Sequence, residues 1–171
     1  MNNKLFVSLL AIVLGFSFVA CDKDKEEKVS AAKAVEGSYV GAVSGLPESL
    51  GTTTLPLTLI LEYASDTKVN VSVEGGSILS FPIEKFSADV TSNGKTSDGS
   101  NKYHINGSGT VSIDGTDFPI PVLLDGDIVD DTPKYGVTTK AATLTITVGA
   151  GVPEGTVPLL PLTLNYTGVA N

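Results

Sequence analysis

The sequence predicts an all-β fold in which residues 35–171 form a single antiparallel barrel of eight strands. Three observations predict it. Several segments alternate apolar and polar residues with a period of two, which is the pattern of a half-buried strand. Glycine-rich turns separate these segments, and 18 of the 171 residues are Gly. After residue 35 no stretch sustains the 3.6-residue apolar period of an amphipathic helix.

The strand candidate TLPLTLILEY shows the pattern most clearly, because it places Leu55, Leu57, Leu59 and Leu61 on one face. The segments that alternate in this way are 54–63, 67–73, 101–113, 142–148 and 159–168. Weaker candidates lie at 35–44, 77–83, 86–91 and 117–124, so we expect eight or nine strands. Glycine-containing breaks predict turns at 74–76, 92–94, 98–99, 114–115 and 125–126.

The period of two does not say whether the apolar face points inward or toward lipid, because outer-membrane barrels share it. Aromatic residues make up only 6% of the chain and Trp is absent, which disfavours the aromatic girdles of such barrels. Proline inside strands is also poorly tolerated in a spanning barrel. The prolines inside strand candidates are Pro56, Pro82, Pro119, Pro121 and Pro161. We therefore expect an apolar interior.

The pentapeptide LPLTL occurs twice, at 55–59 and at 160–164. Proline cannot donate to a strand ladder, so the repeat predicts two edge-like strands. Chance within a β-rich composition explains the repeat equally well.

The first and last strand candidates carry related triplets, Tyr39-Val40-Gly41 and Tyr166-Thr167-Gly168. We expect these two strands to lie side by side and to close the barrel. A glycine next to a large ring lets a strand bend while the ring covers the gap. Division of the strands into two packed sheets is the alternative architecture.

The N-terminus predicts export. Lys4 precedes an apolar run of 16 residues, Leu5–Ala20, which suits a signal-peptide core better than a membrane span of about 20 residues. The run ends at the only cysteine, and Phe18-Val19-Ala20-Cys21 resembles a bacterial lipobox. We therefore predict a lipoprotein signal peptide over residues 1–20 and lipidation of Cys21. A buried free cysteine is the alternative.

Residues 21–34 are expected to form a charged tether after the lipidated cysteine, because Asp and Glu alternate there with Lys and such a segment stays solvated. The segment resembles the acidic patch that directs some lipoproteins of Gram-negative bacteria to the outer face of the cell. A plain hydrophilic linker is the alternative. The predicted location is the outer membrane, lipid-anchored and exposed at the cell surface, with a periplasm-facing position also open.

Composition excludes several partners. The formal charge is −8 and all eleven basic residues are Lys, so the basic face that nucleic acid requires is absent. Docking onto anionic lipid through basic patches is disfavoured for the same reason. With one cysteine in the chain, no internal disulfide can hold the fold.

The order of these features resembles the bacterial calycin-like β-barrel lipoproteins. A lipobox and a tether lead to an early G-x-Y-x-G strand with Gly37, Tyr39 and Gly41, and a Y-T-G strand closes the chain at Gly168. The resemblance covers residues 35–169 and implies a lipocalin-like barrel of eight antiparallel strands. True lipocalins have Trp where this chain has Tyr39. The resemblance implies no assigned activity.

Residues with recognisable chemistry are few. DGDIVDD, residues 125–131, fits neither an EF-hand loop nor a nonapeptide calcium repeat, so a solvated turn is the favoured interpretation. Asp114 and Asp117 are expected in a hairpin turn. His104 is the sole histidine, which favours a surface residue over a zinc ligand, and we assign no metal and no cofactor.

No catalytic residue is assigned, and an enzyme is not expected, because the G-x-S-x-G elbow is absent. Carboxylates converging on His104 would instead favour a hydrolase. Tyrosines are possible platforms for stacking on sugars, but Tyr39, Tyr103 and Tyr166 share faces with core aliphatic residues. Core packing is therefore the favoured role of these three rings.

The predicted function is that of an envelope lipoprotein whose assigned partner is the lipid bilayer, reached through Cys21. The leading hypothesis adds binding of a small apolar or amphipathic ligand in the barrel mouth, at residues the sequence does not identify. The alternative is a structural or interaction protein of the cell surface with a filled barrel. A cavity above roughly 300 Å³ that opens to solvent would favour the ligand carrier.

Overall fold

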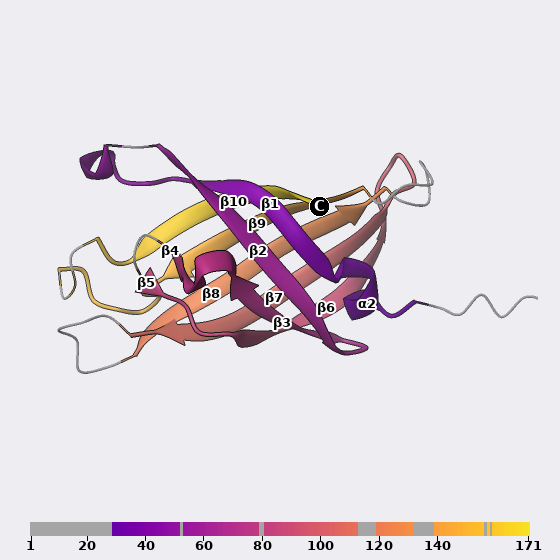
Figure 1. The fold of residues 1–171 in the computed structure, drawn as a ribbon, viewed down its shortest axis with the longest axis horizontal. Coiled ribbons are helices and arrows are strands. Elements are labelled where there is room, and N and C mark those ends of the chain that lie inside the picture. The colour runs from indigo at the N-terminus through magenta and orange to yellow at the C-terminus, as the bar shows by residue number, and fades with distance from the viewer. Residues whose placement is uncertain are drawn as a thin grey trace, which may run out of the picture.

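The chain folds into a closed barrel of eight antiparallel strands (Figure 1). The computed structural model describes residues 29–51, 53–78, 81–112, 119–131, 139–155, 157 and 159–171. Around the barrel the strands follow the order β1-β10-β9-β8-β7-β6-β3-β2. The predicted fold class is therefore confirmed. The predicted signal peptide, Cys21 and the tether as far as residue 28 lie outside the described residues.

The barrel strands are β1 (Gly37–Ser44), β2 (Thr54–Ser65), β3 (Lys68–Val73), β6 (Phe86–Lys95), β7 (Asn101–Val111), β8 (Ile120–Asp130), β9 (Lys140–Val148) and β10 (Leu162–Ala170). The short helix α2 (Ala31–Val35) precedes them. The connections contain the 3-10 turns η1 (Glu48–Leu50) and η2 (Glu74–Gly76). A two-stranded hairpin of β4 (Ser77–Ile78) and β5 (Phe81–Pro82) lies between β3 and β6 in sequence.

The apolar face of each strand points into the barrel, as the alternation predicts. In β2 the side chains of Leu57, Leu59 and Leu61 are buried, while the residues between them are at most half-buried. The same alternation buries Leu144 and Ile146 in β9. Burial of these branched side chains against one another is the main stabilising contribution, since no disulfide is present. None of the helices in the described part of the chain has the length and hydropathy needed to cross a bilayer.

β1 and β10 close the barrel side by side, as their related triplets predict. Gly41 lies opposite Gly168, and Val43 lies opposite Tyr166. The two strands approach so closely that a Cβ atom on Gly41 would lie 2.0 Å from the carbonyl oxygen of Thr167. A Cβ atom on Gly168 would lie 2.2 Å from the hydroxyl of Tyr166. The fully buried Tyr166 ring therefore covers the gap that the glycine leaves.

The hydroxyl of Tyr166 also joins β10 to the next two strands. It donates a hydrogen bond of 2.6 Å to the carbonyl oxygen of Tyr39 in β1. Burial raises the pKa of Tyr166, and a backbone hydrogen bond from Leu59 in β2 opposes that rise. Tyr39 and Leu59 are opposite each other in the β1–β2 ladder. The Tyr166 hydroxyl therefore bonds both members of one cross-strand pair.

Helix α2 covers one end of the barrel (Figure 1). Ala32 and Val35 are fully buried, and the hydroxyl of Tyr39 donates a 2.8 Å hydrogen bond to the carbonyl oxygen of Val35. Lys140 Nζ donates to the carbonyl oxygen of Glu36 at 3.1 Å, just beyond the helix. The packed part of the chain therefore begins within the segment that the sequence assigns to the tether.

The opposite end carries the longer connections, of which the structure describes residues 45–51, 53, 74–78, 81–85, 112, 119, 149–155, 157 and 159–161. Buried apolar side chains from three of these connections belong to the core. They are Leu46, Ile78, Ile83, Val152, Val157 and Leu160. In the described residues both ends of the barrel are thus covered by apolar side chains.

Two turn predictions are wrong. The turn predicted at 125–126 lies inside β8. The turn predicted at 92–94 lies inside β6, where the register with β7 shifts between Ser92 and Lys95. Gly126 is a glycine because of close packing: a Cβ there would lie 2.4 Å from the carbonyl oxygen of Thr143 in β9. The solvated-turn interpretation of residues 125–131 fails for the same reason, since 125–130 belong to β8.

Candidate functional site

In the part of the chain that the structure describes, the barrel interior is closely packed around a small apolar cavity. The cavity has a volume of about 10 Å³. Its lining comes from β2, β3, β6, β8 and β9 and from the apolar covering of the end opposite α2: Leu59, Val71, Val73, Ile78, Ile83, Phe86, Val122, Leu124 and Ile146. A volume of roughly 10–15 Å³ accommodates one water molecule, whereas small-molecule sites measure about 300–1,000 Å³. The apolar side chains of the described strands fill this space themselves.

A polar network lies on the outer wall, around the sole histidine. The register of β7 and β8 pairs His104 with Asp127 and pairs Asn106 with Asp125. His104 Nδ1 lies 3.3 Å from Asp127 Oδ1, and His104 Nε2 lies 3.3 Å from Asp125 Oδ1. Lys102 Nζ binds the other oxygen of Asp127 at 2.9 Å. Two carboxylates therefore converge on His104, which is the arrangement that would favour a hydrolase.

The geometry of the histidine does not suit nucleophilic catalysis. A general-base histidine uses one ring nitrogen for the nucleophile and the other for the orienting carboxylate. Here a carboxylate oxygen lies 3.3 Å from each ring nitrogen, and 36% of the His104 side chain is exposed on the outer wall. The arrangement instead resembles a cross-strand network that fixes the β7–β8 register.

The electrostatics of Asp127 fit this structural role. Its partial burial raises its pKa, but hydrogen bonds from Lys102 and His104 outweigh burial and hold the pKa below its usual value. Asp127 is therefore ionised throughout the neutral range and can hold both neighbours. Among the residues that the structure describes, no group of three or more His, Cys, Asp or Glu side chains is arranged to hold a metal ion.

The acidic stretch at 125–131 is divided by the alternation of β8. Asp125 and Asp127 face outward at His104, whereas Asp130 is buried at the α2 end. Asp131 accepts a hydrogen bond from the hydroxyl of Ser100, whose side chain is only 1% exposed. The four carboxylates of this stretch therefore lie at three separate places in the fold: beside His104, at the α2 end of the barrel, and beside Ser100. Asp114 and Asp117 lie outside the described residues.

The tyrosines are placed as predicted. Tyr39, Tyr103 and Tyr166 are buried core rings, and burial raises the pKa of all three. The carboxylate of Asp130 adds to that rise for Tyr39 and Tyr103. Tyr63 is 40% exposed and donates to Asp66 Oδ1 at 2.9 Å. The rings of Tyr39, Tyr103 and Tyr166 therefore pack the interior, as the sequence predicts.

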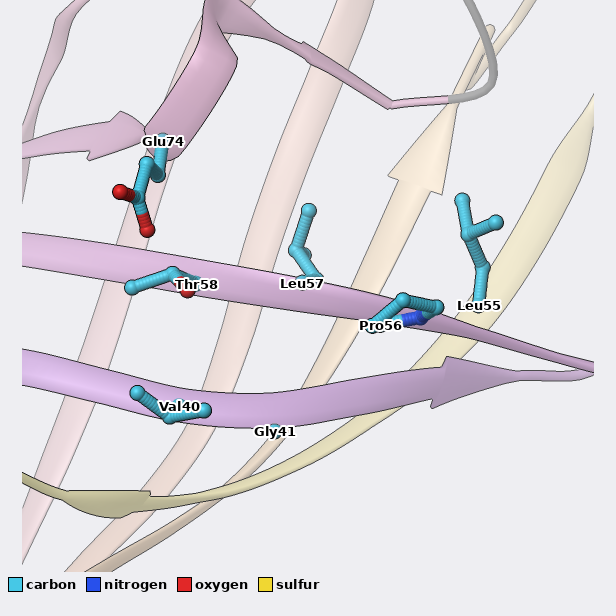
Figure 2. Close-up of a pocket in the computed structure, with 7 residues that line it drawn as sticks. All are labelled: Val40, Gly41, Leu55, Pro56, Leu57, Thr58 and Glu74. Atoms are coloured by element: carbon cyan, nitrogen blue, oxygen red, sulfur yellow. The ribbon is translucent and has the colours of Figure 1, made fainter.

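A groove of about 220 Å³ opens on the outside of the barrel, where β2 passes between β1 and η2 (Figure 2). Its lining residues are Val40, Gly41, Leu55, Pro56, Leu57, Thr58 and Glu74. Figure 2 shows the carboxylate of Glu74 reaching toward Thr58 from the side of β2 away from β1. Sequence reasoning did not locate this groove. The proline in LPLTL was its one signal, since proline favours strand edges.

Comparison with known proteins gave no match: no family model fits the sequence, and no curated protein or solved structure is significantly similar to it.

Proposed function

We propose that this chain is an envelope lipoprotein that is anchored in the outer membrane by acylation of Cys21. Its barrel serves as a structural or interaction module. The closed eight-stranded barrel and the lipobox-like sequence around Cys21 support the proposal. Of the two functions that the sequence left open, the packing favours the one without a small-molecule ligand.

The packed interior is the observation that carries this choice. Branched side chains such as Leu59, Val71 and Ile146 leave a cavity of about 10 Å³ between them. Apolar residues from α2 cover one end and those from the long connections cover the other. An apolar ligand would have to displace several of these side chains, and opening a core in this way costs several kcal/mol.

The anchor and the fold together define an orientation. The eight residues from Cys21 to Lys28 reach at most about 30 Å when fully extended. The α2 end would therefore lie near the bilayer, because the chain enters the barrel there. The end with the long connections and the outer wall would face outward, where partner proteins can reach them.

Metabolic labelling tests whether Cys21 is acylated and anchors the chain in the membrane. Cells that produce the full chain are grown with radiolabelled palmitate, and a Cys21→Ser variant is the matched control. We expect label on the wild-type chain alone and retention of that chain in the outer-membrane fraction. Unlabelled wild-type protein that fractionates with the soluble periplasm would contradict the proposal.

Fluorescent probes test the absence of a carrier function. The purified mature chain is titrated with cis-parinaric acid and with anilinonaphthalene sulfonate, which become fluorescent inside apolar pockets. We expect no saturable rise in fluorescence while the circular dichroism spectrum stays that of a β protein. Saturable, stoichiometric binding would favour the ligand carrier instead.

A further inference from the structure

The outer wall of the barrel divides into a charged half and an uncharged half. β3, β6, β7 and β8 are consecutive around the barrel, and their outward side chains form ion pairs. Lys68 of β3 pairs with Asp89 of β6, and Lys102 of β7 pairs with Asp127 of β8. β2, β1, β10 and β9 complete the circle (Figure 1). This second half, the neutral wall, comprises β9, β10, β1 and residues 54–60 of β2, and its outward side chains carry no charge.

Small and β-branched side chains make up the neutral wall. At its centre β1 presents Val40 and Ala42 opposite Val169 and Thr167 of β10. Thr167 in turn lies opposite Thr143 of β9. Val40 is 48% exposed and Val169 is 60% exposed, so this cross-strand pair leaves apolar surface in water. The wall is therefore a continuous surface of short side chains with an exposed apolar pair toward the α2 end.

The charged residues of these four strands stand at the borders of the neutral wall. Lys140, the first residue of β9, donates to the carbonyl oxygen of Glu36 at the α2 end. Glu62 follows the wall in β2 and pairs with Lys85. Glu74 of η2 reaches Thr58 from the side of β2 away from β1 (Figure 2). The surface of β1, β10 and β9 between these borders therefore presents uncharged side chains only.

Charge narrows the choice of partner for this wall. The chain carries a formal charge of −8, so two copies repel each other where their charged surfaces meet. In a contact of twofold symmetry the same patch of both copies meets, so an uncharged patch is compatible with itself. A foreign partner is selected by complementary charge, which this wall does not offer. Attachment to a lipid surface uses aromatic and basic side chains, which the outward positions of the wall lack.

The size of the wall predicts a contact that is weak in solution. Because a barrel wall is curved, two copies touch along β1, β10 and β9 and not over the whole wall. Three strands about 4.8 Å apart and about eight residues long cover about 400 Å² on each copy. The pair then shares about 800 Å², which is less than the roughly 1,200 Å² of a stable complex.

Anchoring in one membrane compensates for the small area. Two anchored copies are confined to the same layer, and both hold the α2 end toward the bilayer. The neutral wall lies on the side of the barrel, so the copies can meet wall to wall about an axis perpendicular to the membrane. Confinement of this kind raises the effective concentration of each copy for the other.

We propose that the neutral wall, centred on β10, is the surface through which two membrane-anchored copies of this chain pair side by side. The proposal rests on the proposed function, because it takes acylation of Cys21 as the source of the confinement. Pairing covers the exposed side chains of Val40 and Val169 and brings no like charges together.

Cysteine crosslinking in intact cells tests the contact. Cells produce the full chain with Asn165→Cys, which places a thiol on the exposed face of β10, and are treated with a membrane-permeant bismaleimide. Acylated Cys21 does not react. Thr91→Cys is the matched control, since it is exposed on β6, diametrically opposite β10 in the strand order. We expect a product of twice the monomer mass from Asn165→Cys, at least about tenfold more abundant than from Thr91→Cys.

Charge variants test whether the partner is a second copy. Thr167→Glu in the Asn165→Cys chain brings two carboxylates to one contact and should reduce the dimeric product at least about tenfold, whereas Thr91→Glu should leave it unchanged. Thr167→Lys alone should reduce it as well. Cells that produce differently tagged Thr167→Glu and Thr167→Lys chains should recover the mixed dimer. This recovery keeps the test decisive if a charged variant folds poorly, since a misfolded chain would not regain its partner.

Three results would overturn the pairing. They are equal crosslinking from Asn165→Cys and Thr91→Cys, crosslinks of Asn165→Cys only to proteins of other masses, and a dimeric product that Thr167→Glu does not reduce. The second would assign the wall to a different protein. If any of them occurs while Cys21 takes up the palmitate label, the pairing alone has failed. Absence of the label would remove the proposed function and, with it, the confinement on which the pairing depends.

Discussion

Tyr166→Phe is the substitution that most directly probes how the barrel closes. It keeps the ring over Gly168 and removes only the hydroxyl. The carbonyl oxygen of Tyr39 then loses a donor at 2.6 Å, and the N–H of Leu59 loses an acceptor. Both partners lie deep in the core, where water cannot replace the hydroxyl.

The expected loss follows from the groups left unpaired. A buried backbone group without a partner costs about 1–3 kcal/mol. Two groups, the carbonyl of Tyr39 and the N–H of Leu59, lose their partner, but they face each other in the ladder and can move closer together, which offsets one of the two penalties. We therefore expect the free energy of unfolding to fall by about 1–3 kcal/mol. In a domain of this size each kcal/mol lowers Tm by about 2–4 °C.

Urea unfolding followed by circular dichroism in the strand band measures the change. Tyr63→Phe is the matched control, because Tyr63 is 40% exposed and its hydroxyl bonds Asp66 at the surface. That variant should lose less than about 0.5 kcal/mol. Equal effects of the two substitutions would refute the assignment of a cross-strand role to the Tyr166 hydroxyl.

Three further predictions follow from the same geometry. Gly41→Ala should lower the free energy of unfolding in urea by more than about 2 kcal/mol, since the added Cβ would lie 2.0 Å from the carbonyl oxygen of Thr167. Gly109→Ala is the control and should cost less, because its Cβ would meet the Phe86 side chain at 2.6 Å. Equal costs would contradict the close approach of β1 and β10. Raised pKa values of Tyr39 and Tyr166 mean that the unfolded chain releases these protons first above pH ~10. The free energy of unfolding should therefore be independent of these groups below that pH and fall as the pH rises above it, with a shallower slope in Tyr166→Phe. Identical slopes would contradict the burial of the Tyr166 hydroxyl. Asp127→Asn should cost less than about 0.5 kcal/mol near neutral pH because the Asp127 side chain is 37% exposed. The difference from wild type should vanish as the pH falls through the depressed pKa of Asp127. A loss well above about 0.5 kcal/mol would contradict the small contribution that this exposure predicts for the ion pairs of Asp127.

Local sequence patterns predict most of the barrel. The period of two identifies the strands and their inward faces, because burial on one side acts on every second residue. The related triplets at Tyr39 and Tyr166 predict closure, since each pairs a large ring with a glycine two residues later. These features depend on near neighbours in sequence and are therefore visible there.

Contacts between distant segments decide what the sequence misses. Asp125-Gly126 has the chemistry of a turn, but Leu144 and the backbone of β9 require a glycine within a continuous strand at that point. The helix α2 is too short to predict from its own sequence and is held by burial of Val35.

The candidate sites depend in the same way on strand register. His104 meets its two aspartates only because β7 and β8 pair in one register. The groove beside β2 forms where β3 ends at Val73 while β2 extends back to Thr54. Neither strand length nor register can be read from either segment alone, so the sequence did not locate the groove.

Native mass spectrometry of the mature chain, purified gently from cells that make it, tests the central claim most directly. A barrel filled by its own side chains should give the mass of the polypeptide and any acyl groups, with nothing else retained. A stoichiometric small molecule that leaves only on unfolding would contradict the account.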